Sequence, residues 1–122
     1  MITICVVLEE GYESTFEHLA FRQLKGAYGC NLVAVPHHFP TLQEALDSLD
    51  MPKVFMLPPG RVESTPYRDY VMPEGDVAFI LGSPQETLVG YVGDNQALHI
   101  TTPHPVDMMS ISIAGVILYG HG

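Results

Sequence analysis

ITICVVL, residues 2–8, and NLVAVP, residues 31–36, flank the segment ESTFEHLAFRQLKGAYG, residues 13–29. The first run is almost continuously apolar and β-branched, which is typical of a strand that is covered on both faces. The middle segment has the apolar spacing of an amphipathic helix. A strand, a helix and a second strand in this order predict the repeating unit of a parallel α/β sheet.

The helix in this unit has recognisable ends. Ser14 and Glu17 predict a capping box at its start, and Gly29 predicts its stop. Arg22 lies off the apolar stripe of the helix. The apolar residues at helical spacing are Phe16, Leu19, Ala20, Leu24 and Tyr28.

The rest of the chain continues the alternation of strands and helices. Thr41 and Glu44 predict a second capping box for a helix over residues 41–50. Residues 58–75 are rich in proline and glycine and are long for a connection, which favours a functional loop. The remaining elements that we expect are strands over 53–57, 76–82 and 97–101 and a helix over 108–119. The sequence therefore predicts one α/β domain over residues 1–122, with a parallel sheet of about five to six strands flanked by helices.

Composition restricts the class of protein. Fourteen acids against five bases give a formal net charge of −9, which is opposite to the charge of a domain that grips phosphate backbones unaided. Cys5 and Cys30 lie in or beside strand-like runs, so buried reduced thiols in a cytosolic protein are favoured over a disulfide. No apolar run approaches the roughly 20 residues that a membrane span needs. These features predict a soluble cytoplasmic protein that does not bind membranes.

Ligands of parallel α/β folds bind beyond the carboxyl ends of strands. The candidate loops are therefore residues 58–61, 82–86 and 101–109. Gly82 ends a strand, where it either admits a ligand close to the backbone or serves as a plain turn glycine. Asp107 is a candidate N-cap for the last helix. Met108 and Met109 either fill the core or face a flat heteroaromatic ring.

The sequence gives little support for a metal site or for the catalytic motifs of common enzyme classes. The six histidines show no recognised metal-ligand spacing, which predicts that no metal is bound. Motifs typical of esterases, phosphate-binding loops and dinucleotide-binding folds do not occur. Arg22 is one of few basic residues, so it is either solvated or the partner of a phosphate or carboxylate.

Three segments in order resemble motifs of the SpoU/TrmH class of SPOUT methyltransferases. FEHLAFRQLKGAYG is similar to the motif N-x-G-A-I-x-R-T-A-x-A-F-G, with Arg22 at its arginine and Phe16 at its asparagine. FILGSPQETL is similar to L-V-x-G-x-E-x-x-G-L, where Gly82 matches, but Pro84 and Thr87 replace the glutamate and the second glycine.

TPHPVDMMSISIAG resembles the third motif, in which I-P-M is followed by V-D-S-L-N-V-S-V-A-A. The family's S-L-N is replaced here by Met108, Met109 and Ser110. The matching positions are Pro103, Val106, Asp107, Ser112 and Ala114. The resemblance covers almost the whole chain.

This resemblance implies a trefoil-knotted domain that binds S-adenosylmethionine and methylates a ribose 2′-hydroxyl of tRNA or rRNA. It implies a homodimer, and RNA as a partner although the net negative charge disfavours it. Arg22 and Ser110 would be the catalytic residues, with Arg22 handling the acceptor. The resemblance places the cofactor at Leu57, Leu81, Gly82, Ile100, Thr102, Pro103, Met108, Met109 and Ser110.

Two other functions stay open. The altered motif positions and the charge of −9 favour a catalytically inactive module that binds the cofactor or another protein. An enzyme that acts on S-adenosylmethionine itself, or on another small molecule, would explain the lack of basic surface.

Overall fold

The computed structural model describes residues 1–121 except 9–11, 60–62, 83–84 and 105–107. Its centre is a sheet of six strands in the order β2-β1-β5-β3-β6-β4, in which every neighbouring pair is parallel. The strands are β1 (Ile2–Val7), β2 (Asn31–Val35), β3 (Lys53–Met56), β4 (Thr65–Pro66), β5 (Val77–Gly82) and β6 (Gln96–His99). The predicted parallel sheet is confirmed.

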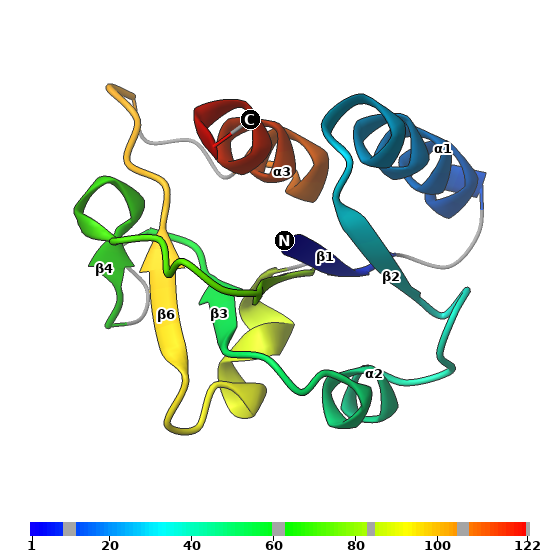
Figure 1. Ribbon diagram of the computed structural model, residues 1–122, viewed down its shortest axis with the longest axis horizontal. Coiled ribbons are helices and arrows are strands. Elements are labelled where there is room, and N and C mark those ends of the chain that lie inside the picture. Colours follow the sequence, from blue (N-terminus) through cyan, green and yellow to red (C-terminus); the bar gives the residue numbers. More distant parts are fainter. Residues whose placement is uncertain (9–11, 60–62, 83–84, 105–107, 122) are drawn as a thin grey trace.

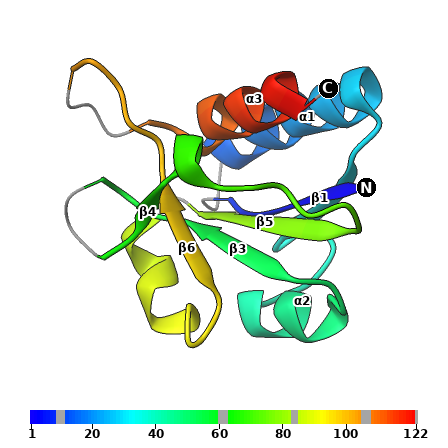
Figure 2. The same cartoon turned by 60° about the vertical axis from the view of Figure 1, so that its left-hand side comes forward.

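Helices cover both faces of this sheet. The helices α1 (Tyr12–Tyr28) and α3 (Ser110–His121) form one layer, and α2 (Leu42–Ser48) lies on the opposite face together with the 3-10 helix η2 (Gln85–Tyr91) (Figure 1). A short 3-10 helix, η1 (Tyr67–Asp69), follows β4. The layers are separated clearly when the molecule is turned (Figure 2).

The strands divide the apolar side chains between two cores. Phe79 and Leu81 of β5 belong to the core under α1 and α3, whereas Ala78 and Ile80 of the same strand belong to the core beside α2 and η2. This alternation follows from the two-residue period of a strand. Because all six residues of β5 are buried, its sequence is a continuous apolar run rather than an alternating one.

Two of the predicted helix ends are confirmed. Gly29 follows α1 with a positive φ of 68°, and its N–H donates to the carbonyl of Lys25 at 2.9 Å. This is the left-handed cap that glycine adopts without steric cost. The Oγ1 of Thr41 accepts a hydrogen bond from the N–H of Glu44 at 3.2 Å, so Thr41 is the N-cap of α2.

Other boundaries differ from the sequence prediction. The helix α1 begins at Tyr12, so Ser14 lies inside it and is not an N-cap. The helix α3 begins at Ser110 rather than at residue 108, and the carbonyl of Met109 accepts the N–H of Ile113 at 3.1 Å. Met109 therefore occupies the N-cap position that we predicted for Asp107, which lies outside the described residues.

The predicted apolar stripe of α1 is also wrong in its rotation about the helix axis. Phe21 is the buried residue, and Ala20 and Leu24 are half-buried beside it. Phe16 and Leu19, which the stripe included, are exposed. Apolar residues occur on more than one face of this helix, so their spacing alone did not select the buried face.

Candidate functional site

The carboxyl ends of three neighbouring strands bring together the loops predicted to bind a ligand. In the sheet order, β5 ends at Gly82, β3 ends at Met56 and β6 ends at His99. The N–H of Leu57 donates to the carbonyl of Leu98 at 2.8 Å, which extends the contact between β3 and β6 by one residue. Parallel strands end at the same edge of a sheet, and that edge is where α/β proteins bind ligands.

Ser110 connects α3 to this edge. Its hydroxyl donates a hydrogen bond to the carbonyl of Gly82 at 2.9 Å, and the residue is only 5% exposed. Ser110 is the first residue of α3, and Gly82 is the last residue of β5. The bond therefore fixes the start of the last helix against the end of the central strand. The hydroxyl oxygen keeps lone pairs that can accept a further hydrogen bond.

Gly82 is packed tightly against η2, so that a side chain at this position would require Leu88 to move. A Cβ atom at this position would lie 3.1 Å from both Cγ and Cδ2 of Leu88, which is itself fully buried. Gly82 does not have a positive φ, so its small size and not its backbone freedom is what the structure requires. The glycine permits η2 to pack against the end of β5.

The other residues predicted to bind the cofactor differ in how accessible they are. Leu57 and Leu81 are buried in the two cores, and Ile100 and Met108 are half-buried against the core under α3. Thr102 donates a hydrogen bond from its hydroxyl to the carbonyl of His104. Pro103 and Met109 are exposed, Met109 to 61%. Among the described residues, the accessible part of this predicted site is therefore formed by Pro103 and Met109, which lie between β6 and α3.

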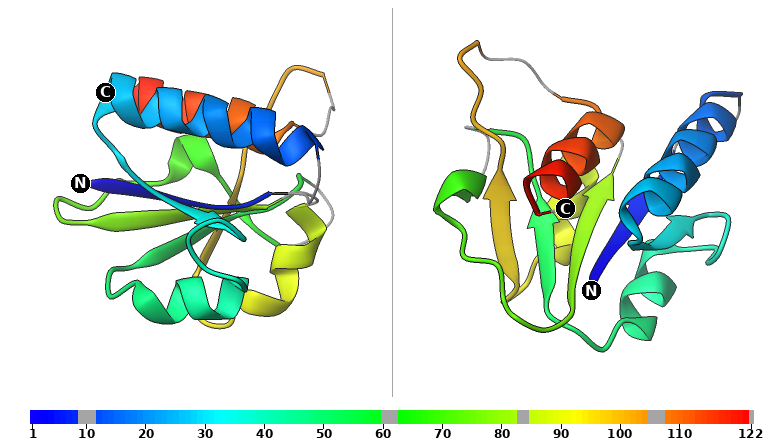
Figure 3. Two further views of the ribbon diagram at one scale, coloured as in Figure 1. Left: turned by 90° about the vertical axis from the view of Figure 1, so that its right-hand side faces the viewer. Right: turned by 45° about the horizontal axis from the view of Figure 1, so that its top comes forward.

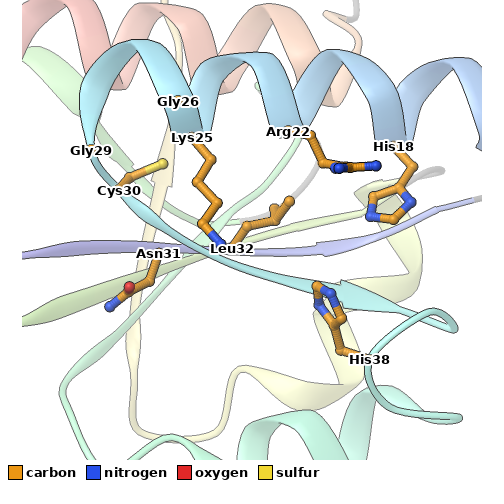
Figure 4. Close-up of a pocket in the computed structure, with 9 residues that line it drawn as sticks. All are labelled: His18, Arg22, Lys25, Gly26, Gly29, Cys30, Asn31, Leu32 and His38. Atoms are coloured by element: carbon orange, nitrogen blue, oxygen red, sulfur yellow. The ribbon is translucent and has the colours of Figure 1, made fainter.

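Arg22 lies elsewhere in the protomer. It projects from α1 into a cavity of about 650 Å³ between this helix and β2 (Figure 4). The residues that line this cavity are His18, Arg22, Lys25, Gly26, Gly29, Cys30, Asn31, Leu32 and His38. None of these except Arg22 was predicted as a site residue, so Arg22 shares no cavity lining with the predicted cofactor residues.

Three histidines lie together, and two of them, His18 and His38, line this cavity. The rings of His18 and His37 stack with their centroids 4.1 Å apart, and the ring of His38 meets His18 edge-on at 6.0 Å. Nδ1 of His38 accepts the N–H of Ala34 at 2.9 Å. Burial lowers the pKa of His18, and the neighbouring His37, His38 and Arg22 lower it further.

Sequence reasoning missed this basic cluster because it examined the histidines only as metal ligands. His18, Arg22 and Lys25 are separated by four and three residues, which places them along one side of a helix. That spacing was the available signal. His38 joins the cluster only through the fold, because its segment follows β2.

The thiols and the potential metal ligands offer no further chemistry in the described part of the chain. Cys5 and Cys30 are both free, as predicted, and burial raises the pKa of Cys5 to about 12. A thiol with this pKa is protonated at neutral pH and is therefore a poor nucleophile. Among the described residues, no group of three histidines, cysteines or carboxylates could hold a metal ion.

Comparison with known proteins shows the fold. No protein-family model matches the chain, and no curated protein matches it significantly. A crystal structure from Bacillus anthracis, described as a "putative RNA methyltransferase", superposes with a TM-score of 0.64 and 14% sequence identity over 98% of this chain and 91% of that chain. The two chains therefore share an α/β fold over almost their full lengths. In the described part of this chain, no helix is both long enough and apolar enough to cross a membrane.

Proposed function

We propose that this protein is an S-adenosylmethionine-dependent RNA methyltransferase with a SPOUT-like, trefoil-knotted fold, and that it methylates a ribose 2′-hydroxyl of tRNA or rRNA. The observation that carries this proposal is the fold likeness, which extends over 98% of the chain. The order of the three sequence motifs supports it independently, because two of them fall at the joined ends of β5 and α3.

The residues beyond β5, β3 and β6 fit the requirements of the cofactor. Ile100 and Met108 provide half-buried apolar surface, and Met109 provides exposed and adaptable surface beside them. Backbone groups of the segment that follows β6, such as those of Thr102, would provide the few polar contacts that orient a heteroaromatic ring. S-adenosylmethionine would supply a methyl group that is bonded to a positively charged sulfur.

Methyl transfer to a hydroxyl requires that the acceptor be aligned and lose its proton. Arg22 would orient the acceptor with its guanidinium group, and Ser110 would accept a hydrogen bond while it holds α3 in place. Arg22 lines a cavity whose lining includes none of the predicted cofactor residues. This separation supports an active site that is completed across a homodimer.

The layer formed by α1 and α3 is the surface that supports a dimer. The two helices lie side by side (Figure 3). Phe16 and Leu19 of α1 and Val116 and Tyr119 of α3 are exposed apolar residues in this layer. Exposed apolar residues mark a protein interface when they form a contiguous patch, and we propose that these four do so. A second copy of the chain would cover them.

Replacement of Val116 by aspartate is expected to dissociate this dimer. A two-fold interface contains the substitution twice, and each buried carboxylate would lack a partner. We expect the dimer dissociation constant to rise by at least about tenfold in sedimentation equilibrium. The matched control is Val89→Asp in η2 on the opposite face, because Val89 is 41% exposed and Val116 is 40% exposed. An equal effect of both variants, or a monomeric wild-type protein, would contradict the proposed interface.

An inactive module remains the second candidate function. Phe16, which stands where the family has asparagine, is an exposed apolar residue and cannot replace the hydrogen bonds of an amide. A module that binds the cofactor but has lost the reaction would also show the interface and the cofactor affinity. Methyl transfer to RNA from labelled S-adenosylmethionine distinguishes the two candidates.

Calorimetric titration with S-adenosylmethionine and S-adenosylhomocysteine tests the cofactor site. We expect saturable binding to the wild-type protein, weakened at least about tenfold by Met109→Arg, since the added cation and bulk would repel the sulfonium group and fill the site. Met109 is exposed, so this variant is expected to remain folded. Substitution of Gly82 is less suitable, because a side chain there would collide with Leu88.

Gln96→Arg is the matched control for this titration. Gln96 is exposed and lies at the amino end of β6, whereas Ile100 and Thr102 follow its carboxyl end. The control adds the same charge at the opposite edge of the sheet and should leave the affinity unchanged. Absence of binding to both ligands in the wild-type protein would refute the methyltransferase proposal.

A further inference from the structure

The cavity between α1 and β2 concentrates positive charge in an acidic protein. The chain has five lysines and arginines and a net charge of −9, yet two of the five, Arg22 and Lys25, line this one cavity. None of its nine lining residues, all of which the structure describes, is acidic. Like charges three residues apart on a helix repel each other weakly, and a bound anion would relieve this repulsion.

The imidazole groups add hydrogen-bond donors to this charge. His38 uses Nδ1 to accept the N–H of Ala34, so the proton of its neutral ring is on Nε2. Figure 4 shows His38 projecting from the segment after β2 toward His18 and Arg22, which project from α1. A ligand between these elements would meet a guanidinium group, imidazole groups and an ammonium group.

The shape of the cavity indicates the size of the ligand. A volume of about 650 Å³ lies in the range of pockets that hold molecules of nucleotide size. Gly26 has no heavy atom within 4 Å of a Cβ built upon it, so the wall beside Lys25 is open. Leu32 and Asn31 at the start of β2 offer an apolar surface and an amide, which suit a sugar or a base better than a bare inorganic anion.

We propose that this cavity binds the phosphate group of a nucleotide unit, with Arg22 and Lys25 holding the phosphate oxygens and His18 and His38 donating further hydrogen bonds. Arginine matches the geometry of phosphate with two parallel hydrogen bonds, and lysine adds a point charge. The nucleotide unit has two sources, a free mononucleotide or the backbone of a single-stranded RNA. The proposal does not rest on methyl transfer, because binding here needs no cofactor.

The test is a titration of the wild-type protein with uridine 5′-monophosphate and, separately, with the tetranucleotide (rU)4, followed by amide chemical shifts. We expect saturable shifts around Arg22, Lys25 and Asn31. Arg22→Gln and Lys25→Gln should each raise the dissociation constant at least about tenfold. Arg68→Gln is the matched control, because it removes the same charge from an exposed arginine of η1 outside the cavity.

The titrations with uridine 5′-monophosphate and with (rU)4 distinguish the two possible sources of the bound nucleotide unit. Comparable affinity for the mononucleotide and for (rU)4 would identify a free nucleotide as sufficient, whereas binding of (rU)4 alone would identify an RNA backbone. The absence of binding by both, or an equal loss of affinity in Arg22→Gln and Arg68→Gln, would overturn the proposal. The cofactor titrations of the wild-type protein and of Met109→Arg report on the methyltransferase proposal separately, since Met109 does not line this cavity.

A pH series gives a second readout. His37 and His38 face His18 from the segment after β2, and Arg22 faces it from α1. Burial, and after it the nearby His37, His38 and Arg22, lower the pKa of His18 in the free protein, and a bound phosphate would raise it. Affinity for (rU)4, whose phosphodiesters keep their charge, should therefore increase from about pH 7.5 to about pH 6.0. His18→Gln should reduce this dependence, and an unchanged pH profile would exclude His18 from the site.

Discussion

Replacement of Phe79 by alanine is expected to lower the free energy of unfolding by about 3–5 kcal/mol. Phe79 lies in the middle of β5 and is fully buried. Tyr67 and Tyr70 meet its ring edge-on, with centroids at 6.5 Å and 6.2 Å. The substitution removes buried apolar surface, leaves a cavity and breaks both aromatic contacts, each of which contributes about 0.5–1.5 kcal/mol beyond its area.

Urea unfolding followed by circular dichroism measures this loss. Phe39→Ala is the control, because Phe39 is only half-buried at the margin of the other core and should cost about 1 kcal/mol. Equal losses in the two variants would mean that the contacts of Tyr67 and Tyr70 do not anchor their segment. Burial raises the pKa of both tyrosines, so their ultraviolet titration should move back toward ordinary tyrosine behaviour in Phe79→Ala.

A methyl group added at Gly82 is expected to destabilise the protein by about 1–3 kcal/mol. The new Cβ atom would lie 3.1 Å from two atoms of Leu88, whose buried side chain has little room to move. Gly26→Ala is the matched control with the opposite sign, because Gly26 lies inside α1 with open space around it. Alanine there should stabilise the helix by about 0.5–1 kcal/mol.

A double-mutant cycle identifies the collision. Leu88→Ala removes the two atoms that the new methyl group would meet. We expect Gly82→Ala to cost less in that background than in the wild-type protein, so that the two unfolding free energies do not add. Additive effects would show that Gly82 is required for a reason other than the packing of Leu88.

The elements that could be predicted from sequence are those whose local pattern and final burial agree. β1 is an almost continuous apolar run and β5 a continuous one, and most residues of β1 and all of β5 are buried, so their composition already predicted a central position. Thr41 and Gly29 act within four residues of their partners, which makes their role readable in sequence. Local chemistry determines these features almost completely.

The features that were missed depend on distant parts of the chain. β4 has two residues, one of which is Pro66, and it exists because Thr65 and Pro66 pair with β6. The rotation of α1 is fixed by the sheet and by α3, which a helical spacing does not reveal. The sequence predicted that the candidate loops meet at one edge of the sheet, because the carboxyl ends of parallel strands share an edge. It did not predict the basic cavity, because His38 reaches this cavity only after the chain has passed through β2.

The two hydrogen bonds between His38 and Ala34 have a consequence for how the molecule assembles. β2 is an outer strand of the sheet, and an outer strand presents backbone groups that can pair with a strand of another molecule. His38 occupies both groups of Ala34, by donating its N–H to the carbonyl at 2.6 Å and accepting the N–H on its ring. The opposite border, β4, is too short and carries a proline. The sheet therefore offers little for a strand of another molecule to pair with at β4 or at the carboxyl end of β2, which disfavours edge-to-edge aggregation at these two places.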